Sequence, residues 1–520
     1  MKMEVSFGTT IVYVGLISIV ITWAWRVLKW VWLRPKKLER ALRHQGLTAK
    51  SYRLVYGDLK ESSNMFKLAN SKPMILSHDI APRVLPFIYQ TVENFGKDSF
   101  TWIGPTPRVI ITNPEQLKDI FNKFSDFRKL DQNPLTKLLA KGVVTYEDEK
   151  WVKHRRIINP AFHFQKLEHL LPAFAVSHGE MISEWDKMMI SKEGSCELDV
   201  WPYLQNATAD AISRTAFGSS YEEGRRVFQL QKEQAQHVNE VSRSVYFPGW
   251  RFLPTKKNKR MKEIDKEITA SLRNIIHKRK QAMREEEETK DDLLGILLES
   301  NRKEQHDGNK KNIGMSTEDV IEECKLFYFA GQETTSVLLA WTMVLLSMYP
   351  NWQHRARDEV LQVFGNNKPD FDGLTHLKVV TMIFNEVLRL YPPVVTMERK
   401  VNKETQLGKL TLPVGVQLSL PTLLVHHDNE LWGDDATEFK PERFSEGVSK
   451  ATKGRLCFFP FGWGPRICIG QNFAMMEAKM ALALILQHFK FELSPSYAHA
   501  PSTTILLQPQ FGAHLILHKR

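Results

Sequence analysis

The ten residues from 461 to 470 read Phe461-Gly462-Trp463-Gly464-Pro465-Arg466-Ile467-Cys468-Ile469-Gly470. Two glycines and a proline predict a tight turn, and Cys468 then stands immediately before a predicted helix. At that position its sulfur faces free backbone N–H groups and the positive end of the helix dipole. These groups favour the thiolate, which is the form of cysteine that binds a metal. We therefore predict that Cys468 is a metal ligand, whereas a lone cysteine in such a turn would be a small buried residue.

The sequence from 316 to 349 predicts a long buried helix. It begins with a capping box at residues 316–319 and ends where Pro350 stops it. Its centre, residues 326–346, is apolar enough to suggest a membrane span. However, the charge of Glu333 would cost about 3 kcal/mol in lipid. We therefore expect a core helix that carries a polar site.

Residues 5–25 form an uncharged stretch that, as a helix, spans about 31 Å, the thickness of a bilayer core. Basic residues cluster after it, between residues 26 and 43, and the positive-inside rule places that side in the cytosol. We predict a membrane anchor with its flank at 1–33 and a juxtamembrane linker at 34–50, with Pro35 as its stiff point. A single cytosolic domain is predicted for residues 51–520.

The net charge of +12 and the four cysteines exclude several classes of protein. The cysteines contain no C-x-x-C pair, so neither a structural zinc site nor a disulfide framework is expected. The basic balance suits a surface beside anionic lipid. No nucleic-acid module accompanies the charge, so we expect no nucleic-acid partner.

The rest of the chain predicts a mainly helical protein with minor sheet. Residues 115–300 and 471–488 predict helices, and apolar runs broken by Pro and Gly predict short strands at 75–115 and 393–465. Residues 285–316 are charged and predict a mobile connector. The apolar segment 245–254, broken by two prolines and a glycine, predicts a loop. It either tucks against the core or dips into a membrane.

The segment around Cys468 fills every fixed position of F-x-x-G-x-R-x-C-x-G, the signature of the cytochrome P450 family. The chain resembles that family from the anchor to the C-terminus. The resemblance implies a mainly α fold with a small β subdomain and a haem b cofactor in a catalytic domain at 51–520. It makes Cys468 the axial ligand of the haem iron, and a thiolate ligand favours O–O cleavage. It also makes Arg466 a partner of a haem propionate and Phe461 part of the cofactor site.

Residues 330–335, A-G-Q-E-T-T, match the oxygen-activating helix segment of the family. The resemblance places Ala330 and Gly331 against the haem, and Gly331 permits a local widening of the helix there. Thr334 can hold a water molecule by its hydroxyl, and Glu333 can relay protons from solvent. The alternative for Thr334 is a hydroxyl that bonds back to its own helix.

Residues 151–155, W-V-K-H-R, match the family's W-x-x-x-R, which assigns Trp151 and Arg155 to a haem propionate. Arg399 stands where the family places another propionate ligand. Propionates are anionic, so several arginines beside them make electrostatic sense.

Glu386 and Arg389 form the family's E-x-x-R and meet on one face of a helix. Arg443 is the third partner in what the resemblance implies is a structural network behind the haem. An E-x-x-R by itself would be a surface ion pair of little energetic value.

Within the family, the resemblance is to plant enzymes of the secologanin-synthase branch, which includes triterpenoid-sapogenin hydroxylases. It is carried by residues 151–162, 322–335 and 459–473. It implies hydroxylation of a hydrophobic terpenoid, with an oleanane-type triterpenoid sapogenin as the first candidate and an iridoid glucoside or a gibberellin as alternatives. The residues expected to line an apolar pocket are Leu326, Phe327, Phe329, Ala330 and Val337.

The implied reaction consumes O₂ and electrons from NADPH. The sequence carries no dinucleotide fingerprint, so a flavoprotein reductase is the expected electron donor, and cytochrome b5 is a second candidate partner. The anchor implies a single-pass protein of the endoplasmic reticulum membrane with a cytosolic domain. Two rivals are a haem-thiolate isomerase or dehydratase that uses no O₂ and a non-catalytic haem- or steroid-binding membrane protein. The presence of both Glu333 and Thr334 argues against each rival.

Overall fold

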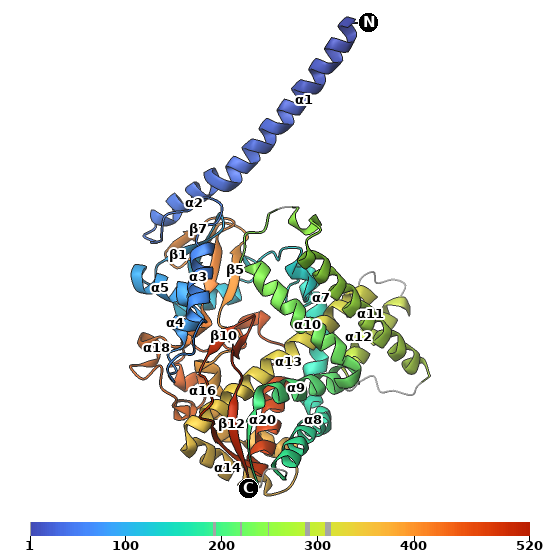
Figure 1. Cartoon of the computed structure of the whole chain (residues 1–520), viewed down its shortest axis with the longest axis vertical. Coiled ribbons are helices and arrows are strands. Elements are labelled where there is room, and N and C mark those ends of the chain that lie inside the picture. The colour runs from blue at the N-terminus through green and yellow to red at the C-terminus, as the bar shows by residue number, and fades with distance from the viewer. Residues whose placement is uncertain (1, 191–193, 219–220, 248, 286–291, 307–313) are drawn as a thin grey trace.

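The computed structural model describes residues 2–190, 194–218, 221–247, 249–285, 292–306 and 314–520. Helices form most of the domain, and one long helix leaves it at the N-terminus (Figure 1). The longer helices are α1 (Lys2–Leu28), α2 (Arg34–Arg43), α3 (Leu59–Ala69), α5 (Pro86–Phe95), α6 (Pro114–Asn122), α7 (Asp148–Ile158), α8 (Phe164–Ile190), α9 (Val200–Phe217), α10 (Tyr221–Ser242), α11 (Lys256–Arg284), α12 (Leu293–His306), α13 (Thr317–Met348), α14 (Pro350–Phe364), α16 (Lys378–Leu390) and α20 (Gln471–His488). The short ones are α4 (Ala81–Val84), α15 (Phe371–His376), α17 (Thr422–His426), α18 (Asn429–Trp432) and α19 (Val448–Ala451). The predicted mainly α fold is confirmed.

The strands form four small sheets. The largest has the order β1-β2-β8-β5-β3, in which β2 and β8 are parallel and the other pairs are antiparallel. The others are β4-β12-β9, β10-β11 and β6-β7. The strands are β1 (Phe100–Ile103), β2 (Thr106–Ile110), β3 (Phe127–Arg128), β4 (Ser195–Asp199), β5 (Met397–Val401), β6 (Thr405–Leu407), β7 (Leu410–Leu412), β8 (Gln417–Leu420), β9 (Phe489–Leu493), β10 (Pro501–Thr503), β11 (Leu507–Pro509) and β12 (His514–Lys519). The predicted strand regions contain β1, β2 and β5–β8, whereas β3, β4 and β9–β12 lie outside them.

Helix α13 is the central helix of the core. The Ser316 hydroxyl accepts the Asp319 N–H at 3.1 Å and caps its start, and Tyr349 follows its last turn. It packs against α9, α16 and α20, and nearly all of its side chains from Val320 to Ser347 are buried. The prediction of a buried helix over 316–349 is therefore confirmed, because a helix that is apolar all round needs neighbours on every side.

A buried ion pair within α16 is linked to the segment that follows β8. Glu386 accepts two hydrogen bonds from Arg389, at 2.8 and 2.7 Å, and both side chains are fully buried. Arg443 reaches the same carboxylate at 3.4 Å and also pairs with Asp435 at 2.8 Å. The predicted contact of Glu386, Arg389 and Arg443 is present. It differs from a surface ion pair because loss of one partner would leave a buried charge uncompensated.

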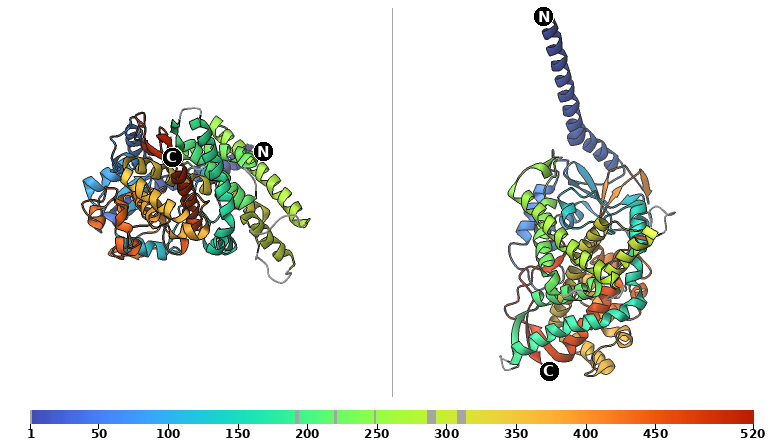
Figure 2. Two further views of the ribbon diagram at one scale, coloured as in Figure 1. Left: turned by 90° about the horizontal axis from the view of Figure 1, so that it is seen from below. Right: turned by 90° about the vertical axis from the view of Figure 1, so that its right-hand side faces the viewer.

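Helix α1 extends away from the domain (Figure 1; Figure 2, right). It continues through the wider π-helical turn Lys29–Leu33 into α2. Among the described residues, the helical stretch Thr10–Arg43 alone is long and apolar enough to cross a membrane, and its apolar part is not buried against protein. These features fit an N-terminal membrane anchor.

Within the juxtamembrane linker predicted for 34–50, residues 34–43 form α2, and its Pro35, Leu38 and Leu42 are buried. Two predictions about irregular segments were wrong. Residues 81–95, expected to be strand and turn, form α4 and α5. Part of the connector predicted for 285–316 is α12, whose buried residues 293, 294, 297 and 298 repeat with helical spacing. The connector's residues 286–291 and 307–313 lie outside the described residues.

The apolar loop between α10 and α11 is packed against the protein at one end and exposed at the other. Val245 is buried, and the Phe247 ring lies 6.4 Å from the Trp30 ring of the anchor segment, in an edge-on arrangement. The side chains of Trp250 and Phe252 are 40% and 71% exposed. The loop lies at the end of the domain from which α1 leaves (Figure 1), so its exposed rings and the anchor share one face.

Deletion of residues 1–33 is expected to release most of the protein from membranes, because it removes the apolar span. The fraction that stays bound should fall further when Trp250→Ser and Phe252→Ser are added, since these rings provide a second apolar contact. The measurement is the distribution between membrane pellet and supernatant. Val363→Ser is the matched control, because Val363 is an exposed apolar residue of α14, at the end of the domain far from α1 (Figure 1). Complete solubility of the simple deletion would contradict the second contact.

Candidate active site

The turn that carries Cys468 is closed by its own backbone. The Cys468 N–H donates to the Phe461 carbonyl at 2.9 Å, and α20 begins three residues after Cys468. Gly462 and Gly464 have φ angles of 75° and 69°, which residues with a side chain rarely adopt. At Gly464 a Cβ would also lie 3.0 Å from the Phe121 carbonyl oxygen. The two glycines are therefore required by the shape of this turn, as the sequence predicted.

The Cys468 side chain is accessible, although the chain surrounds it densely. Its accessible surface therefore faces an internal space. Burial raises the pKa of Cys468, and the Gly470 N–H, Arg155 and Lys129 oppose this rise. A bound metal cation supplies the additional charge that deprotonates a thiol.

Helix α7 and the cysteine turn bring three of the predicted residues together. The Arg155 Nη1 donates to the Ile467 carbonyl at 2.9 Å, which ties α7 to the residue before Cys468. The Arg466 guanidinium lies 4.5 Å from the centre of the Trp151 ring. It also donates to Glu147 at 2.7 Å, but its Nε and Nη1 atoms are buried without a hydrogen-bond partner.

Two more cations lie beside Arg466. Arg399 of β5 is buried, and burial together with Arg466 lowers its pKa to about 10. Burial, Arg399 and Arg466 lower the pKa of Lys129 to about 7. Within the described ranges, no carboxylate lies at ion-pair distance from the Lys129 ammonium or the Arg399 guanidinium. Buried cations without anions are costly, so this cluster requires negative charge from a ligand.

Haem fits these residues. Its two propionates supply carboxylate oxygens that can accept hydrogen bonds from the free N–H groups of Arg466. Their negative charge can also balance the positive charges of Arg399 and Lys129. Cys468 offers an accessible sulfur that interacts electrostatically with Arg155 and Lys129. The described residues contain no other cluster of His, Cys, Asp and Glu able to hold a metal ion.

Lys129 is the member of this cluster that sequence reasoning missed. It follows β3, and its backbone N–H donates to the Glu147 carboxylate at 3.0 Å. The available signal was weak: Lys129 is one of two adjacent cations after the apolar residue Phe127, a common arrangement on a protein surface. Its position beside Arg399 arises from the pairing of β3 with β5, which the spacing of residues within the sequence does not reveal.

The polar residues of α13 are bonded within the protein. The Thr334 hydroxyl donates to the Ala330 carbonyl at 2.8 Å, which is the predicted alternative of a bond within its own helix. Helix α13 is regular around Gly331, so the expected local widening is absent. A Cβ on Gly331 would lie 2.6 Å from the Ile212 side chain, so this glycine allows α9 to pack closely against α13.

Glu333 lies on the side of α13 that faces α9 and α10. The Gln205 Nε2 lies 3.5 Å from the Glu333 carboxylate, and the exposed Lys232 donates to Gln205 Oε1 at 3.3 Å. Burial raises the pKa of Glu333, an effect that Lys232 and Gln205 partly oppose. Lys232, Gln205 and Glu333 therefore form a polar path from the surface toward Thr334, and Gln205 and Lys232 were not predicted.

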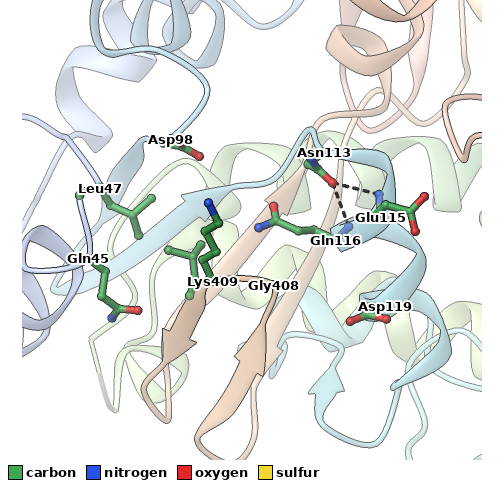
Figure 3. A pocket seen from close by; sticks show the side chains of 11 residues that line it. Gln45, Leu47, Asp98, Asn113, Glu115, Gln116, Asp119, Gly408 and Lys409 are labelled. Carbon is green, nitrogen blue, oxygen red and sulfur yellow. Dashed lines mark hydrogen bonds between the residues drawn. The ribbon is translucent and has the colours of Figure 1, made fainter.

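A surface groove lies away from these residues. It measures about 510 Å³ and lies between the residues after α2, the start of α6 and the β6-β7 hairpin (Figure 3). In Figure 3 the side chains of Gln45, Asp98, Gln116 and Lys409 border it. None of the predicted site residues lines it.

Comparisons with known proteins agree with the fold and the sequence motifs. The family profile named Cytochrome P450 matches residues 86–515. Cytochrome P450 72A397 of Kalopanax septemlobus is 64% identical over 497 residues, covering 96% of this chain and 95% of the relative. Cytochrome P450 72A15 of Arabidopsis thaliana is 57% identical over 517 residues, covering 99% of this chain and all of the relative. A retinoic-acid-bound cyanobacterial CYP120A1 structure has a TM-score of 0.72 at 23% identity, covering 84% of this chain and 94% of that chain, and so supports the fold alone.

The fold and the matched family define a haem-dependent monooxygenase that uses O₂ and electrons supplied by a reductase. The chain belongs to the cytochrome P450 family and, within it, to the plant CYP72 branch.

Replacement of the predicted iron ligand tests the centre of the site. Cys468→Ser is expected to abolish the red-shifted absorption band of the reduced, CO-bound protein and most haem retention, because serine provides no thiolate. Cys457→Ala is the matched control, since Cys457 is a buried cysteine eleven positions earlier and should keep the band. A Cys468→Ser protein that keeps the band would show that another residue binds the iron.

Proposed function

We propose that this P450 hydroxylates a hydrophobic plant terpenoid, most specifically an oleanane-type triterpenoid sapogenin, at an unactivated carbon. The observation that carries the monooxygenase part is the accessible sulfur of Cys468 beside a cluster of cations of which, within the described residues, only Arg466 pairs with a carboxylate. The choice of substrate rests on the plant branch and on the apolar surroundings of the site.

In this proposal the chain holds haem by charge and by sulfur. Haem, once bound, supplies the iron at which O₂ is activated. Cys468 would bind that iron, while Arg155, Arg399, Arg466 and Lys129 would hold the propionates. The remaining members of the cofactor site would be Trp151, Phe461, Ala330 and Gly331.

Proton delivery would follow the path from Lys232 through Gln205 to Glu333. The Gln205 amide can accept from Lys232 with its oxygen and donate to Glu333 with its nitrogen, which matches the observed contacts. The raised pKa of Glu333 means that its carboxyl keeps a proton at higher pH than an exposed glutamate does. For the last transfer, the Thr334 hydroxyl would turn from the Ala330 carbonyl and hold a water molecule that passes the proton on.

The proposed setting is the endoplasmic reticulum membrane. A single span within residues 1–33 would anchor a cytosolic catalytic domain at 51–520, and α2 would join the two. An NADPH-dependent flavoprotein reductase would supply electrons, and cytochrome b5 is a second proposed partner. The exposed rings of Trp250 and Phe252 lie beside the anchor, so they would meet the lipid in which an apolar substrate dissolves.

The expected apolar lining of α13 holds only in part. Phe327 stacks on Phe162, with ring centres 5.3 Å apart, and is turned into the core. Leu326 and Val337 are also buried, whereas Phe329 and Ala330 keep partial exposure. Phe329 and Ala330 are therefore the two residues of this set proposed to meet the substrate.

Oxygen activation is tested by Thr334→Ala. Haem binding should remain, but the product formed per NADPH should fall by about tenfold or more, with hydrogen peroxide released, because proton delivery loses its hydroxyl. Thr342→Ala is the matched control, since Thr342 lies on the same helix and bonds back to Leu338 at 2.7 Å in the same way. Equal coupling in the Thr334 and Thr342 variants would reduce Thr334 to an ordinary helix residue.

The substrate is tested by feeding microsomes that contain the chain and a plant reductase. β-Amyrin-derived sapogenins, loganin and gibberellins are supplied in parallel, and hydroxylated products are identified by mass spectrometry. A hydroxylated sapogenin is expected, because a polar glucoside needs several hydrogen-bonding side chains in its pocket. Turnover of loganin or a gibberellin with no sapogenin product would reject the triterpenoid assignment and leave the monooxygenase intact.

A further inference from the structure

A buried histidine–glutamate pair joins α7 to α13. The His154 Nδ1 lies 2.5 Å from Glu323 Oε1, and both side chains are almost completely buried. The His154 Nε2 lies 3.9 Å from Asp319, one turn earlier on α13. The Tyr146 ring packs edge-on against the imidazole, with ring centres 4.7 Å apart. The imidazole is therefore held by a hydrogen bond at Nδ1 and by the Tyr146 ring, while Asp319 lies near its Nε2.

The second oxygen of Glu323 holds the segment before α7. The Val143 N–H donates to Glu323 Oε2 at 3.1 Å. Its neighbour Gly142 has a φ angle of 93°, and a Cβ there would lie only 2.5 Å from the same oxygen. One carboxylate on α13 thus binds both α7 and residues 142–143, and the close approach requires a glycine.

Both attachments lead directly to the cation cluster. On α7, His154 is adjacent to Arg155 and lies three residues after Trp151. Beyond residues 142–143, the Tyr146 carbonyl accepts a hydrogen bond from Arg466 Nη2 at 2.8 Å. Two separately anchored arginines therefore depend on the position of Glu323.

The same helix carries the oxygen-activating residues. Glu323 precedes Thr334 by eleven residues, which corresponds to about 16 Å along a helix. A rigid helix keeps its two ends in fixed register. The distance between the arginines and Thr334 is therefore set through Glu323.

Stability alone is a poor reason for this arrangement. Burial of an acid is costly, and burial raises the pKa of Glu323, although the bonds from His154 and Val143 oppose the rise. A buried polar pair often adds little net stability compared with apolar side chains of the same volume. What such a pair supplies is a single geometry, because each partner is satisfied in one arrangement only.

We propose that His154 and Glu323 are positioning residues that hold the propionate-binding arginines in register with the oxygen-activating part of α13. The inference rests on the haem site proposed above and is independent of the substrate. His154 and Glu323 do not touch the cofactor in this proposal. They act through Arg155 and through the contact between Tyr146 and Arg466.

The experiment measures the rate at which haem passes from the purified holoprotein to apomyoglobin. His154→Ala is expected to raise that rate by about tenfold or more, as is typical when a residue behind a ligand is removed. Glu323→Gln, which preserves shape, should raise it in the same direction and serves if His154→Ala does not fold. The CO-bound absorption band should persist in haem that remains bound, because Cys468 is untouched.

Lys325→Met is the matched control. Lys325 is also a buried charge of α13, but it pairs with Asp265 of α11 at 2.6 Å and not with α7. Its loss should lower the temperature of unfolding without a comparable change in haem release. Equal acceleration of haem release by Lys325→Met and His154→Ala would overturn the proposal, since both would then act through general stability.

A double-mutant cycle tests whether His154 acts through Arg155. Arg155→Ala should accelerate haem release by itself, and His154→Ala should then add less than it adds to the wild-type chain. Full additivity would overturn the proposal. Unchanged release in Arg155→Ala would overturn the proposed propionate site and this inference with it. Fast release in Arg155→Ala but wild-type release in both His154→Ala and Glu323→Gln would overturn the inference alone.

Discussion

The buried ion pair of Glu386 and Arg389 is the interaction on which the candidate haem site depends. Arg389 Nη1 donates to the His426 carbonyl at 2.8 Å, and the His426 Nε2 accepts the Phe459 N–H at 3.1 Å. Burial, His427 and Arg389 lower the pKa of His426 to about 3, so the ring is neutral and can accept. The chain of bonds ends two residues before Phe461, where the turn of Cys468 begins. Since every polar group in this chain is satisfied, the turn has one position relative to α16.

On the other side of the turn, the cations lack enough anionic partners. There Arg399, Arg466 and Lys129 crowd together, and the pKa values of all three are lowered chiefly by burial. The carboxylate of Glu147 neutralises only part of this positive charge, through its ion pair with Arg466. The fold satisfies the ion pair of Glu386 and Arg389 completely, but it leaves this cluster with fewer anions than cations. The excess positive charge lies where the cofactor is proposed to bind.

Helix α13 connects these regions because it takes part in each of them. Its apolar surface forms the middle of the core, Glu323 near its start faces α7, and Glu333 faces the polar path to Lys232. A helix that is packed on all sides tolerates few substitutions. At Gly331, for example, a single added carbon would collide with Ile212. Oxygen activation, proton supply and cofactor position are in this way proposed to share one rigid element.

Structural features that depend on residues close together in the chain could be predicted from the sequence. The capping of α13 at Ser316, the bounds of α20 and the glycine-dependent turn before Cys468 each depend on residues a few positions apart. Helical spacing also identified Glu386 and Arg389 as partners, and the family motifs named Trp151, Arg155, Arg399 and Arg466. These local features are found in the structure because the spacing of side chains along a helix or turn is the same in any surroundings.

Only the tertiary structure decided which distant groups meet. Lys129 joins Arg399 through strand pairing, and His154 meets Glu323 across 169 positions of sequence. The strands β4 and β12 likewise pair although they lie far apart in the sequence, and α12 replaced part of the expected connector. The physical reason is that contacts between elements depend on how their surfaces pack together, and the spacing of residues within one element carries no record of its neighbour.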